Sequence, residues 1–178
     1  HRLKMIGSYT ISLDFELRWG IRDNAGADAY EAAILGGRRA IPHMLRLFQD
    51  HDVAATWATV GFLFAENREE LIGHLPAIRP AYQTAQFSPF HDVETRVGTD
   101  EADDPLHFGL SLIRQIQDTP RQEIGSHTFS HFYCLEQGGN AEAFGADMAA
   151  AQTIANAKGL HVQSLVLPRN QLSPSHQP

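Results

Sequence analysis

The sequence predicts an α/β protein in which parallel strands alternate with helices. Short β-rich runs at 9–14, 53–60, 123–126 and 164–167 are separated by longer stretches with apolar residues at helical spacing. Polar residues able to do chemistry gather where these runs end. Because such alternation is typical of parallel strands joined by right-handed crossovers, we expect helices to cover the sheet and a functional site to lie at the carboxyl ends of the strands.

The first half of the chain supplies two strands and two helical stretches. Tyr9–Asp14 is β-rich and ends in a carboxylate. Apolar residues at helical spacing predict a helix over 30–50, with Pro42 as a kink or a boundary between two helical pieces. Val53–Val60 is the second predicted strand, and a helical stretch over 62–75 follows it.

The second half begins with a long polar connection from Arg79 to Asp104, rich in Pro, Gly and acidic residues. Loops of this length are uncommon in compact domains, so it is either a functional loop or a solvated excursion. Asp104 is expected to cap a helix that begins at Pro105 and runs to Asp118. The remaining predicted elements are a strand at 123–126, a helix at 141–158 and a fourth strand at 164–167.

Composition excludes several classes of function. The 14 Lys and Arg residues face 21 Asp and Glu residues, a net charge of −7, which gives no electrostatic footprint for nucleic acid or an anionic membrane surface. The longest uncharged apolar run, 53–65, is well short of the roughly 20 residues that cross a bilayer. Cys134 is the only cysteine, so no internal disulfide forms, and we expect an inert buried thiol.

The chain as given has no apolar segment behind residues 1–5, so no secretory signal is expected and the cytoplasm is favoured. An extracytoplasmic location stays open, because a removed signal leaves no trace.

Two clusters of candidate site residues end two of the predicted strands. Asp14 and Glu16 close the first strand, and strand alternation is expected to turn them to the same face. His127 and His131 follow the third strand at the i, i+4 spacing that brings two imidazoles to one side of a helical turn. Arg169 follows the fourth strand. All five residues therefore fall on the same predicted rim.

Two histidines and one carboxylate form a mixed nitrogen and oxygen ligand set. This set suits catalytic Zn²⁺, and Co²⁺, Mn²⁺ or Ni²⁺ can substitute. Such a metal polarises a carbonyl and lowers the pKa of bound water, and a second carboxylate that does not bind the metal can take the water's proton. Asp14 and Glu16 together supply the ligand and the base.

Three segments resemble a known family in order and spacing. Thr10–Glu16, Ala55–Phe62 and Glu123–His131 are similar to the first half of the polysaccharide deacetylase family, the NodB-homology domain of carbohydrate esterase family four. The resemblance implies a distorted (β/α) barrel of the seven-stranded type, of which about four βα units are present here. It also implies one catalytic domain over 1–178 that is truncated at its C-terminus.

The resemblance carries roles to individual residues. His127 and His131 look like the metal ligands of the Ser-His-Thr-x-x-His motif, Asp14 like the base that activates water, and Glu16 like the carboxylate ligand. The family has adjacent aspartates where this chain has Asp14-Phe15-Glu16, and Arg two residues before Pro where this chain has Pro168-Arg169.

Two further residues receive roles on weaker grounds. By the resemblance, Arg169 orients the base. Trp19 follows the carboxylates and either stacks on a sugar ring as a substrate-binding residue or packs in the core. In the family the general acid is a histidine of a late motif, and after Asn170 this chain holds only His176.

The expected function is a metal-dependent hydrolase that removes acetyl groups from N-acetylated sugars of a polysaccharide or its precursor. One alternative is a catalytically silent domain that binds a metal and a glycan or partner protein. Another is a related amidohydrolase acting on a small cyclic amide. Because four βα units fall short of the about 250 residues typical of a barrel, we expect either a fragment or a homo-oligomer in which another copy covers the exposed sheet edge.

Overall fold

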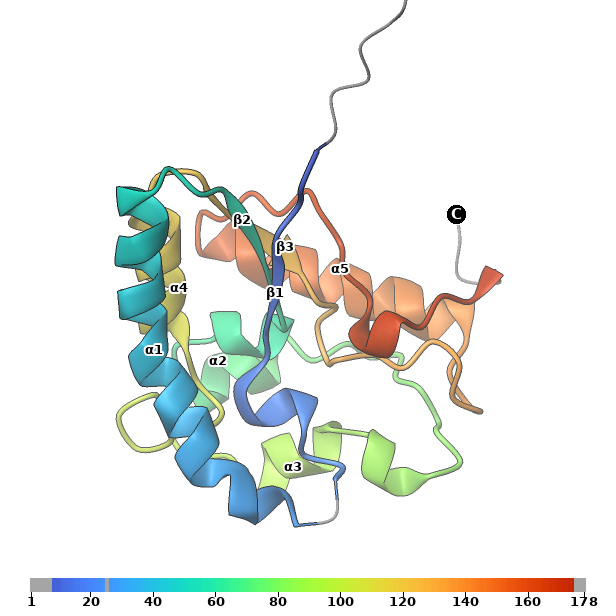
Figure 1. The fold of residues 1–178 in the computed structure, drawn as a ribbon. Coiled ribbons are helices and arrows are strands. Elements are labelled where there is room, and N and C mark those ends of the chain that lie inside the picture. Colours follow the sequence, from blue (N-terminus) through green and yellow to red (C-terminus); the bar gives the residue numbers. More distant parts are fainter. Residues whose placement is uncertain (1–7, 25, 175–178) are drawn as a thin grey trace, which may run out of the picture.

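The computed structural model describes residues 8–24 and 26–174 and shows a small parallel sheet between two layers of helices (Figure 1). The sheet has the order β1-β2-β3, with β1 at Ser12–Phe15, β2 at Ala55–Thr59 and β3 at Gln122–Ser126. The helices are α1 at Glu31–Asp50, α2 at Arg68–Gly73, α3 at Phe90–Thr95, α4 at Leu110–Asp118 and α5 at Ala141–Ala157. The N-terminal segment and His176 lie outside the described residues.

The expected distorted barrel of four βα units is wrong for the described residues, which form an open three-stranded sheet. The predicted fourth strand, 164–167, pairs with β3 only through an isolated parallel bridge between Ser126 and Leu165. Ser126 donates its N–H to the carbonyl of Ser164 and accepts from the N–H of Val166, and pairing stops there. A barrel needs a continuous ring of paired strands, whereas alternation in the sequence predicts only parallel neighbours.

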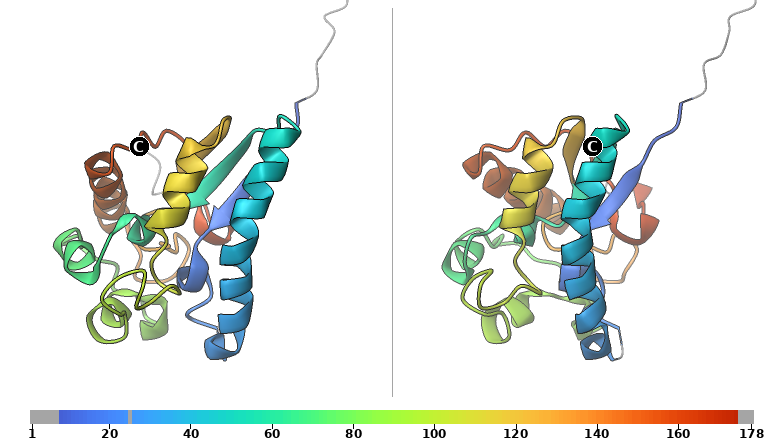
Figure 2. Two further views of the ribbon diagram at one scale, coloured as in Figure 1. Left: turned by 90° about the vertical axis from the view of Figure 1, so that its left-hand side faces the viewer. Right: turned by 60° about the vertical axis from the view of Figure 1, so that its left-hand side comes forward.

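The crossovers place the helices as the alternation predicts. Helix α1 connects β1 to β2 and α4 connects β2 to β3, and the two lie side by side on one face of the sheet (Figures 1 and 2). Helix α5 lies on the opposite side. Because the three strands are parallel, their carboxyl ends all point to one edge of the sheet.

Helix boundaries differ from expectation in four places. The stretch predicted to be helical over 62–75 is a 3₁₀ turn at Gly61–Phe64 followed by the short helix α2. Helix α1 runs without interruption through Pro42. The polar connection 79–104 contains a 3₁₀ turn at Ala85–Phe87 and helix α3. Helix α4 begins at Leu110, because the Asp104 carboxylate caps the turn before it by accepting from the N–H groups at positions 106 and 107.

The aromatic core extends to the carboxyl edge of the sheet. The Phe62 ring meets Trp19 and Phe129 edge-on, with centroid separations of 4.6 and 4.8 Å. Gly61 permits this approach, since a Cβ there would lie 2.8 Å from the Cα of Phe129. The core therefore fixes the segment between the two candidate histidines. Among the described residues, no helix is long and apolar enough to cross a bilayer.

Candidate metal centre

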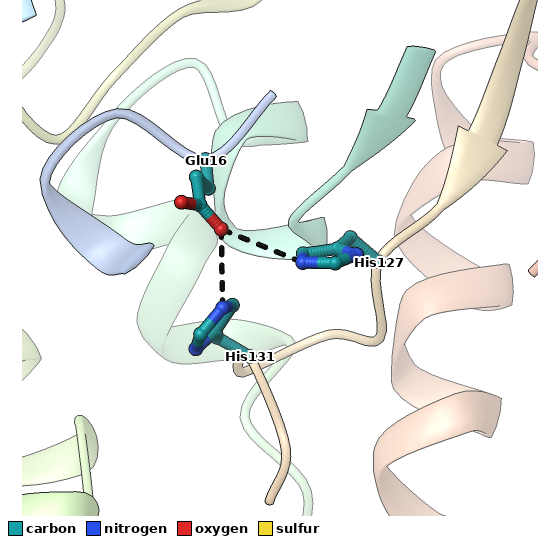
Figure 3. Close-up of side chains that lie close together, drawn as sticks. All are labelled: Glu16, His127 and His131. Atoms are coloured by element: carbon teal, nitrogen blue, oxygen red, sulfur yellow. Dashed lines mark ion pairs between the residues drawn. The ribbon is translucent and has the colours of Figure 1, made fainter. Parts of the chain in front are cut away.

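Three side chains from the ends of β1 and β3 meet at the carboxyl edge of the sheet (Figure 3). Glu16 follows β1, and His127 and His131 follow β3. The Oε2 atom of Glu16 lies 3.4 Å from Nε2 of His127 and 3.1 Å from Nε2 of His131. Each residue offers one ligand atom, and these atoms all lie within 4.8 Å of one another. Glu16, His127 and His131 can therefore hold a metal ion.

Local backbone geometry delivers the Glu16 carboxylate. Strand β1 ends at Phe15, and Glu16 itself has ψ −16°, so the chain leaves the strand there and enters a 3₁₀ turn at Leu17–Gly20. The carboxylate folds back over this turn. A Cβ at Gly20 would lie 1.9 Å from Cδ of Glu16, which means that only glycine leaves room for the carboxylate in this position.

His127 is held in one orientation by the segment that bridges to β3. Its Nδ1 lies 2.8 Å from the carbonyl oxygen of Val166, which can only accept, so Nδ1 carries the proton and donates it. In a neutral imidazole this leaves a lone pair on Nε2, the atom that faces Glu16. Such a hydrogen bond to a carbonyl is the usual way proteins orient a metal-binding histidine.

The two histidines come together through a loop, and not through the helical turn expected from their spacing. Residues 127–131 are not helical, and Thr128 and His131 have φ values of 63° and 57°, in the left-handed region. Such conformations are costly for residues other than glycine and concentrate at functional sites.

A buried carboxylate on α5 holds this loop in place. Asp147, which is 0% exposed, accepts hydrogen bonds from the N–H of Phe129 at 2.6 Å and from the N–H and hydroxyl of Ser130. The backbone strain at the histidine loop is therefore offset by a network that joins the loop to a long helix.

The electrostatics of the three residues are compatible with a bound cation. Partial burial raises the pKa of Glu16, but hydrogen bonds and charge from His127 and His131 outweigh it and lower the pKa to about 2. Burial, in turn, lowers the pKa of His131 against the opposing pull of Glu16. The carboxylate thus relies on positive charge that buried His131 does not readily carry, and a cation can supply it.

The separations also fit a metal. A tetrahedral ion with ligand bonds of 2.0–2.1 Å keeps its ligand atoms about 3.3 Å apart. The two separations from Glu16 Oε2, 3.1 and 3.4 Å, agree with that geometry, and the ligand atoms of the two histidines lie within 4.8 Å of each other. Cys134 is buried, and burial raises the pKa of its thiol to about 11; it is not part of the ligand group.

The other residues expected at the site lie around this group. Asp14 is exposed and lines, with Glu16, a cavity of about 410 Å³ between β1 and α1, but it does not belong to the ligand group. Arg169 forms an ion pair with Asp23. Trp19 is 1% exposed and donates its indole N–H to the carbonyl of His107, so the structure makes it a core residue with no ring face open to a sugar.

Sequence reasoning missed three residues that shape the site. Gly20 makes room for Glu16, Asp147 holds the histidine loop, and Asp23 pairs with Arg169. Asp147 sits inside an alanine-rich helix, where a single acidic residue on the buried face was a signal available in the sequence. Asp23 and Gly20 carry no such signal, because their roles depend on how the chain turns after β1.

No protein-family model matches the chain, and no curated protein matches its sequence.

Proposed function

We propose that this protein is a metal-dependent hydrolase that removes acetyl groups from N-acetylated sugars, with Zn²⁺ held by Glu16, His127 and His131. One observation carries the proposal. The lone pair on Nε2 of His127 faces a carboxylate oxygen at 3.4 Å, and two acceptors that face each other are favourable only with a proton or a cation between them. His131 presents Nε2 to the same oxygen at 3.1 Å.

The chain's own residues have distinct roles in this proposal. A bound divalent cation polarises the acetyl carbonyl and lowers the pKa of a water molecule. Asp14 acts as the general base, because its carboxylate lines the same cavity as Glu16 and does not belong to the ligand group. The apolar residues that line the rest of this cavity, most of them from β1 and α1, shield the reacting group from bulk water.

The direct test is acetate release after metal reconstitution. The chain is stripped with a chelator, reloaded with Zn²⁺ and offered chitooligosaccharides and acetylated glycan fragments. We expect metal-dependent acetate release that Asp14→Asn abolishes while metal binding persists. His51→Gln, which changes an exposed histidine away from the site, is the matched control and retains activity. Clear Zn²⁺ binding without acetate release from any of these substrates contradicts the proposal.

A second candidate, a metal-binding domain without catalysis, is favoured by one observation. The arginine expected to orient Asp14 instead pairs with Asp23, and Asp14 makes no hydrogen bond or ion pair within the described part of the chain. An exposed carboxylate without a partner is poorly positioned for proton transfer. This candidate predicts tight Zn²⁺ binding and glycan binding with no release of acetate.

A further inference from the structure

A buried carboxylate outside the ligand group lies behind His131. Asp23 follows the 3₁₀ turn after β1, and its side chain is 1% exposed. Its Oδ2 atom accepts a hydrogen bond from the Tyr133 hydroxyl at 3.1 Å and forms an ion pair with the Arg169 guanidinium. Burial of a carboxylate is costly unless it is paired, and these two partners satisfy the Oδ2 atom of Asp23.

Tyr133 contacts both this carboxylate and the candidate metal centre. The ring packs edge-on against the imidazole of His131, with centroids 5.1 Å apart, and the Arg169 guanidinium lies 4.3 Å above its face. Arg169 has φ 55° and the next residue φ 53°. Two consecutive residues in the left-handed region are energetically costly, and this strain supports a functional role for the contact between Arg169 and Tyr133.

Two buried polar atoms at this position have no hydrogen-bond partner among the described residues: Nδ1 of His131 and Oδ1 of Asp23. They are complementary. When Nε2 of His131 binds a metal, the proton of the neutral ring lies on Nδ1, and this buried N–H then needs an acceptor. The Oδ1 atom of Asp23 accepts no hydrogen bond from the described residues. Against the larger lowering by burial, the Asp23 carboxylate also interacts electrostatically with His131 and acts to raise the pKa of that imidazole.

We propose that Asp23 is the positioning residue of His131: when a metal occupies the site, Oδ1 of Asp23 accepts the Nδ1–H of His131, directly or through one water molecule, while Arg169 and the Tyr133 hydroxyl hold Oδ2. His127 has the equivalent partner in the Val166 carbonyl. A carboxylate behind a metal-binding histidine fixes its tautomer and raises its basicity, which strengthens the metal bond. The inference rests on the metal centre of the proposed function and does not depend on the reaction catalysed there.

The test measures metal affinity and the His131 proton, not turnover. Asp23→Asn keeps the shape of the side chain and removes its charge. We expect Zn²⁺ affinity, measured by competition with a chromophoric chelator, to fall about 10- to 100-fold. In nitrogen-15 NMR of the Zn²⁺-loaded wild type, the Nδ1–H of His131 should be protected from solvent exchange, and the variant should lose that protection.

Two controls separate positioning from general damage to the fold. Glu101→Gln breaks a carboxylate pair with Arg38 elsewhere in the molecule and should leave both readouts unchanged. Tyr133→Phe keeps the ring and removes only the hydroxyl, so it should shift the Nδ1–H resonance and weaken Zn²⁺ binding less than Asp23→Asn does. This second variant keeps the test valid if Asp23→Asn does not fold.

The outcomes distinguish the two proposals. If the wild type binds Zn²⁺, and Asp23→Asn and Tyr133→Phe bind it as tightly with an unchanged Nδ1–H signal, the role of Asp23 is overturned and the metal centre stands. If the variants weaken binding but no substrate is deacetylated, the role of Asp23 stands and the hydrolase falls. If the wild type binds no divalent metal, both are overturned.

Discussion

Asp147 on α5 accepts hydrogen bonds from both donors of Ser130 in the histidine loop: the backbone N–H, which lies 3.2 Å from Oδ2 and 3.4 Å from Oδ1, and the hydroxyl. The Asp147 carboxylate is completely buried, and its hydrogen-bond donors within the described part of the chain are all neutral groups. An anion held only by dipoles is sensitive to pH. The conformation of the loop that carries His127 and His131 therefore depends on the protonation state of Asp147, which lies outside the ligand group.

Asp147→Asn is expected to change the pH dependence of stability. Burial raises the pKa of Asp147 from 3.8 to about 6. Because the folded value lies above the unfolded one, the folded protein binds this proton more tightly, and stability falls as pH rises from about 4 to above 6. The shift corresponds to on the order of 3 kcal/mol. Asparagine has no such proton and should lack this dependence.

The measurement is chemical unfolding of both metal-free proteins between pH 4 and 7.5. The wild type should lose stability relative to Asp147→Asn across this range, and most of the change should fall between pH 4 and 6. Taking the difference between the two proteins cancels the other carboxylates, including Glu101 and Asp104, whose lowered pKa values act in the opposite direction. A difference that stays constant with pH contradicts the assignment.

Zn²⁺ is expected to stabilise the fold through the three ligands. At a free metal concentration about 100 times the dissociation constant, binding to the folded state alone adds about 2.7 kcal/mol. Thermal unfolding with and without Zn²⁺ measures this gain. His131→Gln should eliminate it, whereas His51→Gln, at an exposed position, should preserve it in full. Equal stabilisation of all three proteins would show that the ion binds elsewhere.

The alternation of β-rich and helical segments was sufficient to predict the parallel strands and the edge where polar residues gather. It could not predict the extent of the sheet, because pairing of 164–167 depends on neighbouring strands and not on local propensity. The sequence also predicted that Glu16 and the two histidines lie at one site, because they follow strands whose carboxyl ends share an edge. It could not foresee that the His127–His131 segment is a strained loop, since that conformation depends on Asp147 and on contacts with the core.

The sequence also could not predict which carboxylate pairs with Arg169. Arg169 was expected to serve Asp14, and the structure pairs it with Asp23. Both carboxylates lie near the end of β1, and only the path of the chain through the turn at Leu17–Gly20 decides which one reaches the arginine. Long-range pairs of this kind are set by tertiary packing, which a local pattern does not encode.

Trp19→Phe tests the assignment of this residue to the core. The change removes the hydrogen bond from the indole N–H to the carbonyl of His107 and leaves space beside Phe62. Loss of one partner of a buried polar group costs about 1–3 kcal/mol. We therefore expect a lower melting temperature with unchanged glycan affinity and Zn²⁺ affinity. A selective loss of glycan binding at full stability would restore the stacking role.

Gly20→Ala is expected to damage the metal centre without unfolding the protein. A Cβ at this position would lie 1.9 Å from Cδ and 2.0 Å from Oε1 of Glu16, so the flexible carboxylate must move away. The fold tolerates that movement, because the clash is with the end of a side chain and not with backbone. Isothermal titration with Zn²⁺ should show a loss of affinity of at least about tenfold, similar to the loss of a supporting contact at a metal site.

Gly145→Ala is the matched control for this substitution. Gly145 lies within α5, and a methyl group added there would meet nothing within 4 Å. This variant should bind Zn²⁺ normally and gain about 0.5–1 kcal/mol of stability, because alanine is the better helix former. Equal Zn²⁺ affinity in the two variants would mean that Glu16 does not bind the metal from its position over the Leu17–Gly20 turn.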